Sequence, residues 1–158
     1  YCWGKRPNRL VLIGNRILVM GKILTTIVLI ASLAGCSSAS NLTLYQQLGG
    51  QAGLQRLVDS FINQIGNDEQ IIHYFEHANI SHFREGFINH LCVLTDGPCE
   101  YTRDSMVDIH TGMHITEGDF NHVVDLLINA MNEQNISHTV QNKILAKMAP
   151  LRTEIIKI

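Results

Sequence analysis

Two histidines stand four positions apart in the segment DIHTGMHITEGDF, residues 108–120, and their type and spacing could serve metal chemistry. On a single helix, His110 and His114 would lie on one face and could share a metal ion. A zinc-protease helix also needs a glutamate directly after its first histidine as general base, but position 111 is threonine. From the spacing alone, the pair could supply two ligands, one ligand or none.

The residues around the pair weigh against a shared metal. Gly112 favours a helix end, and Thr116 with Asp119 three residues later approximates a capping box, with Asp in place of the usual Glu or Gln. We therefore expect a helix end and a turn between the two histidines. In that arrangement they need not share a face.

The chain has more large apolar side chains than small helices of this length usually need, and they are Phe75, Phe83, Phe87, Met106, Ile115 and Phe120. On their own such residues more often form an ordinary core than a cofactor pocket. A single neutral imidazole facing an apolar wall is how proteins commonly hold haem iron. A haem ligand therefore joins the interpretations open for His110.

The elements that must position these residues are all predicted to be helices. Apolar residues recur at helical spacing over 54–65, 71–75, 83–94, 120–127 and 140–155, and no useful length of strand alternation occurs. Ser81 is the expected N-cap of the third segment, and Pro150 is expected to kink the last. The fold class predicted is all-α.

Charge divides the chain into two parts. Residues 1–35 carry five basic residues and no acidic one, whereas the rest carries the other seven basic residues and all fourteen acidic ones. A body with a net charge of −7 lacks the basic surface that nucleic acid requires. We expect no nucleic-acid partner.

The basic segment is interpreted as targeting sequence. Residues 20–35 join a charged start to a 13-residue uncharged run, too short to span a bilayer but suited to a secretory signal. Its end, LAGC, resembles the lipobox of bacterial lipoproteins, which implies acylation of Cys36 and a membrane anchor in the envelope. Ser37 resembles the outer-membrane sorting pattern, with the protein facing the periplasm. We interpret residues 1–19 as sequence upstream of the true start, 36–43 as a polar tether and 44–158 as one domain.

The order of motifs in that domain resembles the group I truncated haemoglobins. Five segments in the family's order carry the resemblance: LYQQLGG (44–50), VDSFINQIGNDEQIIHYF (58–75), DGPCEYT (96–102), SMVDIHTGMHITEGDF (105–120) and LAKMAPLRTEII (145–156). The resemblance implies a two-over-two helical fold around haem b. It also implies that His110 is the proximal iron ligand, donating its second ring N–H to a backbone carbonyl, and that His114 is not a ligand.

The resemblance also implies which residues surround the haem. They are Ile62, Phe75, Phe83, Phe87, Tyr101, Met106, Ile115 and Phe120. The distal side departs from the family: Ile62 replaces a tyrosine, and Phe83 and Phe87 stand where polar groups are common. Gly86 replaces a histidine that ligates iron in some members, and Arg103 replaces a common glycine.

Three function classes remain open. The first is a gas-binding haem protein for O2, NO or CO, with a five-coordinate iron and an apolar distal pocket. The second is a haem enzyme, such as a nitric oxide dioxygenase or weak peroxidase, which would depend on an unidentified reductase. The third is a haem-free helical lipoprotein that serves as an interaction module. The sequence favours gas binding over enzyme activity, because it contains no nucleophile–base–acid constellation and no flavin or nicotinamide domain.

Two further features stay open at this level. Cys92 and Cys99 could form a disulfide in an envelope compartment if their α-carbons come within about 7 Å, although a helix around Cys92 could prevent it. His90, two turns beyond Phe83, is either a satisfied core or edge histidine or a side chain that leans into the distal cavity.

Overall fold

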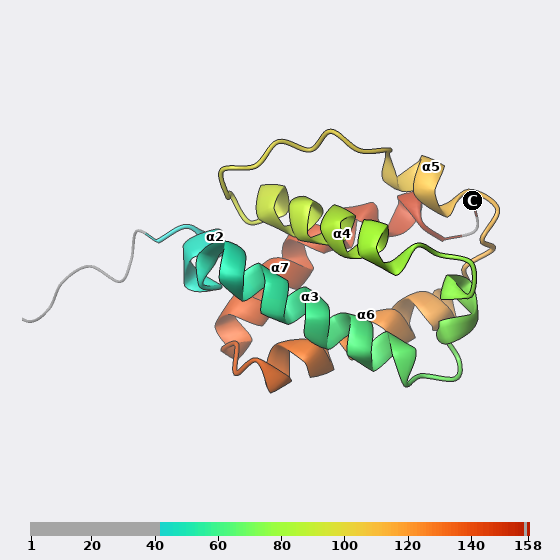
Figure 1. Cartoon of the computed structure of the whole chain (residues 1–158), viewed down its shortest axis with the longest axis horizontal. Coiled ribbons are helices and arrows are strands. Elements are labelled where there is room, and N and C mark those ends of the chain that lie inside the picture. The colour runs from blue at the N-terminus through green and yellow to red at the C-terminus, as the bar shows by residue number, and fades with distance from the viewer. Residues whose placement is uncertain (1–41, 157) are drawn as a thin grey trace, which may run out of the picture. The chain divides into compact units, whose positions relative to one another are not determined.

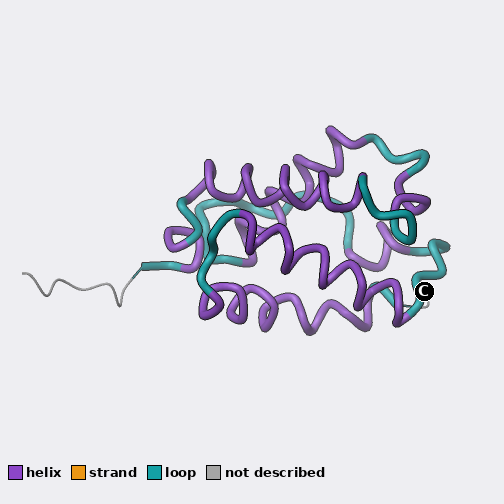
Figure 2. The backbone as a smooth tube through the Cα atoms, turned by 90° about the horizontal axis from the view of Figure 1, so that it is seen from below, coloured by secondary structure: helices purple, strands orange, loops and turns teal. Residues whose placement is uncertain are grey.

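The computed structural model describes residues 42–156 and 158, and this part of the chain consists of helices and loops without a strand (Figure 2). The all-α prediction is confirmed. The helices are α2 (Leu44–Gln47), α3 (Gly50–Gly66), η2 (Ile72–Phe75), α4 (Ile80–Leu94), α5 (Met106–His110), α6 (Glu117–Glu133), α7 (His138–Met148) and η3 (Ala149–Glu154). The predicted signal segment and Cys36 lie outside the described residues.

Helix α3 is the centre of the packing. It packs against both α6 and α4 (Figure 1). It can start close to α2 because residue 53 is glycine: a Cβ there would lie 1.7 Å from the carbonyl oxygen of Leu48. A backbone hydrogen bond of 2.8 Å from Tyr45 N–H to Thr95 O ties α2 to the end of α4. The predicted apolar stripe thus becomes the central helix of the domain.

The hydrophobic core lies where α3, α4, α6 and α7 meet. Its fully buried side chains include Leu54, Leu57, Val58, Leu91, Cys92, Ala130, Met131 and Ile144. Burial of one such large aliphatic side chain contributes about 1.5–3 kcal/mol. These mainly aliphatic residues form a core to which most of the aromatic rings contribute only partly buried faces.

Helix α4 starts earlier than the sequence predicts. Asn79, and not Ser81, is its N-cap, because the Asn79 side chain accepts a hydrogen bond of 3.0 Å from His82 N–H. Asparagine is among the strongest capping residues, so the helix can start two residues earlier without the serine as its cap. The capping box at Thr116 and Asp119 is confirmed, with both reciprocal bonds present at the start of α6.

Two other segments are less helical than predicted. Before η2, the Asp68 carboxylate accepts hydrogen bonds from Gln70 N–H and Ile71 N–H, which replaces a helical first turn with a side-chain turn. At the other end, α7 stops at Met148 and a 3-10 helix containing Pro150 follows. Proline has no N–H for the α-helical bond, so it accompanies a helix end here and not a kink.

No helix among the described residues is long and apolar enough to cross a membrane.

Candidate functional site

His110 is held in the orientation of a metal ligand. It is the last residue of α5, whose start is capped by the Ser105 hydroxyl accepting from Asp108 N–H at 3.1 Å. Its Nδ1 lies 2.7 Å from Met106 O. A carbonyl only accepts, so Nδ1 carries the proton and Nε2 keeps its lone pair. The half-buried imidazole therefore has a fixed tautomer and a second nitrogen available for a metal.

His114 does not share a face with His110. Helix α5 ends at His110, and both Gly112 (φ 82°) and His114 (φ 53°) adopt left-handed conformations beyond it. His114 is exposed. Within residues 42–156, no three His, Cys, Asp or Glu side chains come together as a metal site. Iron held by one histidine and a porphyrin needs no such group of protein ligands and is compatible with the geometry of His110.

A row of aromatic rings runs from η2 along α4. Of the five phenylalanines, Phe61 alone is buried, while Phe75, Phe83, Phe87 and Phe120 stay partly exposed. The ring centres of Phe75 and Phe83 are 5.0 Å apart, those of Phe83 and Phe87 5.8 Å, and those of Phe87 and Phe61 5.3 Å. A domain with a complete aliphatic core does not need to leave its largest rings accessible. The row therefore fits a wall for an apolar group that the chain itself does not supply.

An apolar cavity of about 160 Å³ adjoins this wall. Its lining is entirely apolar and consists of Ile62, Ile65, Gly66, Ile72, Phe75, Ile80 and Phe83. The cavity is much smaller than a porphyrin but large enough for a diatomic gas. The cavity thus brings together Ile62 and Phe83, two of the three predicted distal residues, with Phe75, whereas Phe87 is not part of its lining.

The remaining predicted site residues lie on other elements. Helix α5, with Met106 and His110, packs on η3 and makes no extensive contact with α4. Ile115 is buried at 9% exposure, and the Arg152 guanidinium lies 5.7 Å from the centre of the Phe120 ring. The Tyr101 hydroxyl donates to Asp104 O at 2.8 Å. The proximal and distal groups therefore come from separate elements, as they must if a flat group lies between them.

His90, which the sequence left open, is not a satisfied core or edge histidine among the described residues. Its Nε2 is buried and has no hydrogen-bond partner among the described residues, and its ring meets Tyr101 edge-on at 5.5 Å. Burial lowers the pKa of His90, because it disfavours the charged form of the imidazole. An orphaned polar atom one turn beyond Phe87 fits a site completed by a bound group.

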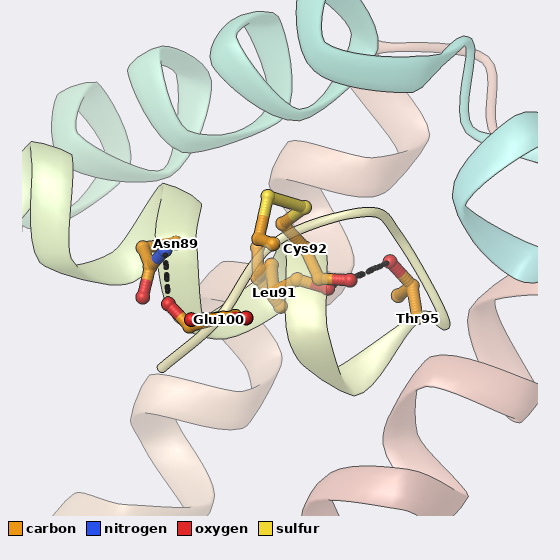
Figure 3. The surroundings of a disulfide bond; sticks show 6 residues. Asn89, Leu91, Cys92, Thr95 and Glu100 are labelled. Carbon is orange, nitrogen blue, oxygen red and sulfur yellow. Dashed lines mark hydrogen bonds between the residues drawn. A yellow bond between two sulfur atoms is a disulfide. The ribbon is translucent and has the colours of Figure 1, made fainter. Parts of the chain in front are cut away.

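The loop after α4 runs back along that helix toward α5 (Figure 1). A disulfide joins Cys99 of the loop to Cys92 of α4, with α-carbons 5.9 Å apart, so the open question of the bridge is answered (Figure 3). Next to it, Asn89 Nδ2 donates to Glu100 O at 3.1 Å (Figure 3). Residue 97 must be glycine for the loop to turn, because a Cβ would lie 2.7 Å from both Cys92 O and Cys92 Sγ. We call this segment, residues 97–104, the return loop.

The resemblance placed Tyr101 of the return loop in the site but did not predict that the loop runs back along α4. It leads directly to Ser105 and α5, so it sets where His110 lies relative to α4. The spacing of Cys92 and Cys99 was the signal that could have found it. The contacts of Tyr101 and Arg103 with α4 had no comparable signal.

The geometry agrees with comparisons to known proteins. The model of the family described as "Bacterial-like globin" matches residues 43–157. This chain belongs to the bacterial-like globins. Among similar proteins, the globin is 28% identical over 98 residues to a group 1 truncated hemoglobin of Tetrahymena thermophila, covering 62% of this chain and 81% of the relative. It is also 28% identical over 123 residues to a group 1 truncated hemoglobin of Mycolicibacterium paratuberculosis, covering 78% of this chain and 90% of the relative.

Solved structures show the same fold. Truncated hemoglobin from Tetrahymena pyriformis in the Fe(III) form superimposes on this globin with a TM-score of 0.71 at 23% identity, covering 74% of this chain and all of the other. The 2/2 hemoglobin from Synechococcus superimposes with a TM-score of 0.70 at 18% identity, covering 74% of this chain and 100% of the other. The globin therefore has the two-over-two fold of the group I truncated haemoglobins, as its motif order predicts.

Proposed function

We propose that this globin binds haem b through His110 and holds a diatomic gas on the opposite face of the iron. The observation that carries the proposal is the Nδ1–H bond of His110 to Met106 O, which leaves Nε2 free and directed by a fixed ring. Family membership supports haem-based gas binding in general. The bound haem would supply the iron at which the gas is held.

The chain's own residues define the two faces of the slot. Met106 and His110 of α5 form the proximal side, and Phe75, Phe83 and Phe87 present partly exposed rings for the distal side. The uncovered rings fit a large, mainly apolar ligand, and the orphaned Nε2 of His90 fits a polar group at the same site. The lining of the apolar distal cavity has no polar side chain, so it offers water no hydrogen-bond partner.

The distal lining supports a preference among gases. Bound O2 carries partial negative charge and gains from a hydrogen-bond donor, whereas CO gains little. Ile62, Phe83 and Phe87 offer no donor at the three distal positions. We therefore propose a five-coordinate iron with fast O2 release, ready autoxidation and a relative preference for NO or CO.

Two histidine variants test the iron ligand. The described domain should show a Soret band when purified with haem. His110→Gly should lose haem or regain the spectrum when imidazole is added, because free imidazole can occupy the space left by the removed side chain. His114→Ala is the matched control and should keep the spectrum unchanged, because His114 is exposed and lies beyond the end of α5. Equal behaviour of both variants would refute the assignment of His110.

We also propose that the protein is anchored to the bacterial outer membrane through acylated Cys36 and faces the periplasm. Two observations support this location: the LAGC segment at residues 33–36 and the disulfide of the globin domain. Disulfides persist in oxidising compartments and are rare in the cytosol. In cells expressing the full chain, Cys36→Ser should abolish lipid labelling and processing. Unchanged processing and membrane association of that variant would contradict the anchor.

A further inference from the structure

The side chain of Arg103 crosses α4 where that helix has no side chain of its own. A Cβ built on Gly86 would lie 3.5 Å from Arg103 Cδ, 3.8 Å from Nε and 3.9 Å from Cζ. Gly86 directly precedes Phe87 and follows Phe83 by three residues, so this crossing lies beside the aromatic wall. The return loop thus brings a guanidinium to the edge of the proposed haem slot.

The neighbours of the Arg103 guanidinium use only some of its N–H donors. Nη1 lies 3.2 Å from each ring nitrogen of His82, and Nη2 lies 3.6 Å from Glu85 Oε2. His82 and Glu85 are exposed, whereas the Arg103 side chain is 28% exposed. A guanidinium has five N–H donors in a fixed fork, and a long ion pair with an exposed glutamate contributes little. Donors therefore remain for a further carboxylate.

Arg84, which lies on α4 itself, offers a useful contrast. Its Nη2 donates to Asp59 Oδ2 at 2.8 Å, and its Nε donates to Asp59 Oδ1, so the fork is filled by one carboxylate. Arg103 has no such bidentate partner among the contacts described above. It is the arginine of this region that is free to take a planar anionic group at the slot's edge.

Haem b carries two propionate carboxylates, and a carboxylate is costly to bury without a charged partner. These groups must therefore lie at the edge of an apolar slot. We propose that Arg103 binds a haem propionate by a bidentate contact across Gly86, with His82 beside it. The inference rests on the proposed haem binding and assigns a positioning role to a residue of the return loop. Charge-assisted bidentate pairs of this type are about twice as strong as neutral hydrogen bonds.

Haem exchange tests the contact without any activity measurement. The ferric protein is loaded with haem or with haem dimethyl ester, which lacks free carboxylates, and transfer to excess apomyoglobin is followed by absorbance. Arg103→Gln should speed the loss of haem about tenfold, as expected for one lost charge-assisted contact, and should leave the loss of the dimethyl ester unchanged. Arg84→Gln is the matched control and should not distinguish the two porphyrins.

The outcomes separate this inference from the proposed function. Equal acceleration for haem and its dimethyl ester in Arg103→Gln would overturn the propionate contact, as would no acceleration for either. Failure of the unmutated protein to bind any porphyrin would overturn haem binding itself. If Arg103→Gln does not fold, Arg103→Lys replaces it. That variant should speed the loss of haem less than tenfold and leave the ester unaffected, and equal effects on both would again overturn the contact.

Discussion

At the scale of single residues, Ile62 defines the distal face of the proposed haem site because its side chain has no hydrogen-bonding group. Its side chain lines the apolar cavity together with Phe75 and Phe83, and it offers no hydrogen-bond donor. The resemblance to the truncated haemoglobins implied that all three residues surround the haem. The contacts of His90 and Arg103 depend on how the return loop crosses α4, and no local pattern encodes such a crossing.

Substitution of Ile62 should therefore change O2 binding selectively. In Ile62→Tyr, the added hydroxyl should slow O2 dissociation by up to roughly tenfold, because a hydrogen bond nets about 0.5–1.5 kcal/mol and 1.4 kcal/mol corresponds to a factor of ten. CO dissociation should change much less. Ligand-replacement stopped flow measures both rates.

Ile62→Phe is the control, since it adds a ring of nearly the same size without the hydroxyl. A similar slowing of O2 dissociation in both variants would attribute the effect to bulk. An already slow O2 dissociation in the unmutated protein would mean that another donor lies over the iron.

At the scale of secondary-structure elements, Asp119 connects α6 to the segment that carries Phe75. Its carboxylate accepts from the Thr116 hydroxyl at 2.6 Å, from Gln70 Nε2 at 2.9 Å and from the Tyr74 hydroxyl at 2.9 Å. The hydrogen bonds from Thr116, Gln70 and Tyr74, in that order, hold the pKa of Asp119 far below its usual 3.8. One side chain thus caps a helix and also fixes the turn before the aromatic wall.

The lowered pKa predicts a pH-dependent contribution to stability. A carboxylate whose pKa falls on folding stabilises the protein above its unfolded pKa, and the contribution is lost as pH falls from about 4 through the lower folded value. Asp119→Ala should therefore lower the free energy of unfolding at pH 7, and the deficit should shrink below pH 4. Urea titrations at several pH values measure this. Asp125→Ala, at an exposed position of the same helix, serves as control. A deficit that does not vary with pH would contradict the role of the ionised carboxylate.

Most of the helices were predictable from the sequence, and each difference at a helix end has an identifiable physical cause. The capping box at Thr116 was visible because both partners are three residues apart in sequence. Asn79 and Ser81 can both cap a helix, and residue type and spacing alone do not distinguish them; in the structure the Asn79 side chain accepts from His82 N–H. The short η2 follows from side-chain bonds to Asp68, which compete with helix formation in a way that apolar periodicity does not reveal.

At the scale of the whole domain, the Cys92–Cys99 disulfide should contribute to global stability. Loop-closure entropy for cysteines separated by seven residues predicts a loss of about 2–3 kcal/mol when the bridge is removed. The double variant Cys92→Ala/Cys99→Ala should therefore unfold at lower urea concentration while keeping its helical spectrum.

Dithiothreitol provides the internal control. It should destabilise the unmutated protein to a similar degree and leave the double variant unaffected, and mass spectrometry of alkylated samples confirms the thiol state. Equal stability of the oxidised and reduced unmutated protein would show that the bridge has no energetic role in this domain.

The overall topology was predictable because five weak motifs occur in one order, and their order constrains the fold more than any single motif does. The course of the return loop was not, since the sequence left even its disulfide open. Its length, however, has a consequence of its own. Surface loops usually accept insertions and deletions freely. Here Cys99, Glu100, Tyr101 and Arg103 meet α4 at Cys92, Asn89, His90 and Gly86 in turn. Each added or removed residue would shift this pairing and displace the start of α5. The length of the return loop therefore fixes the distance between α4 and His110.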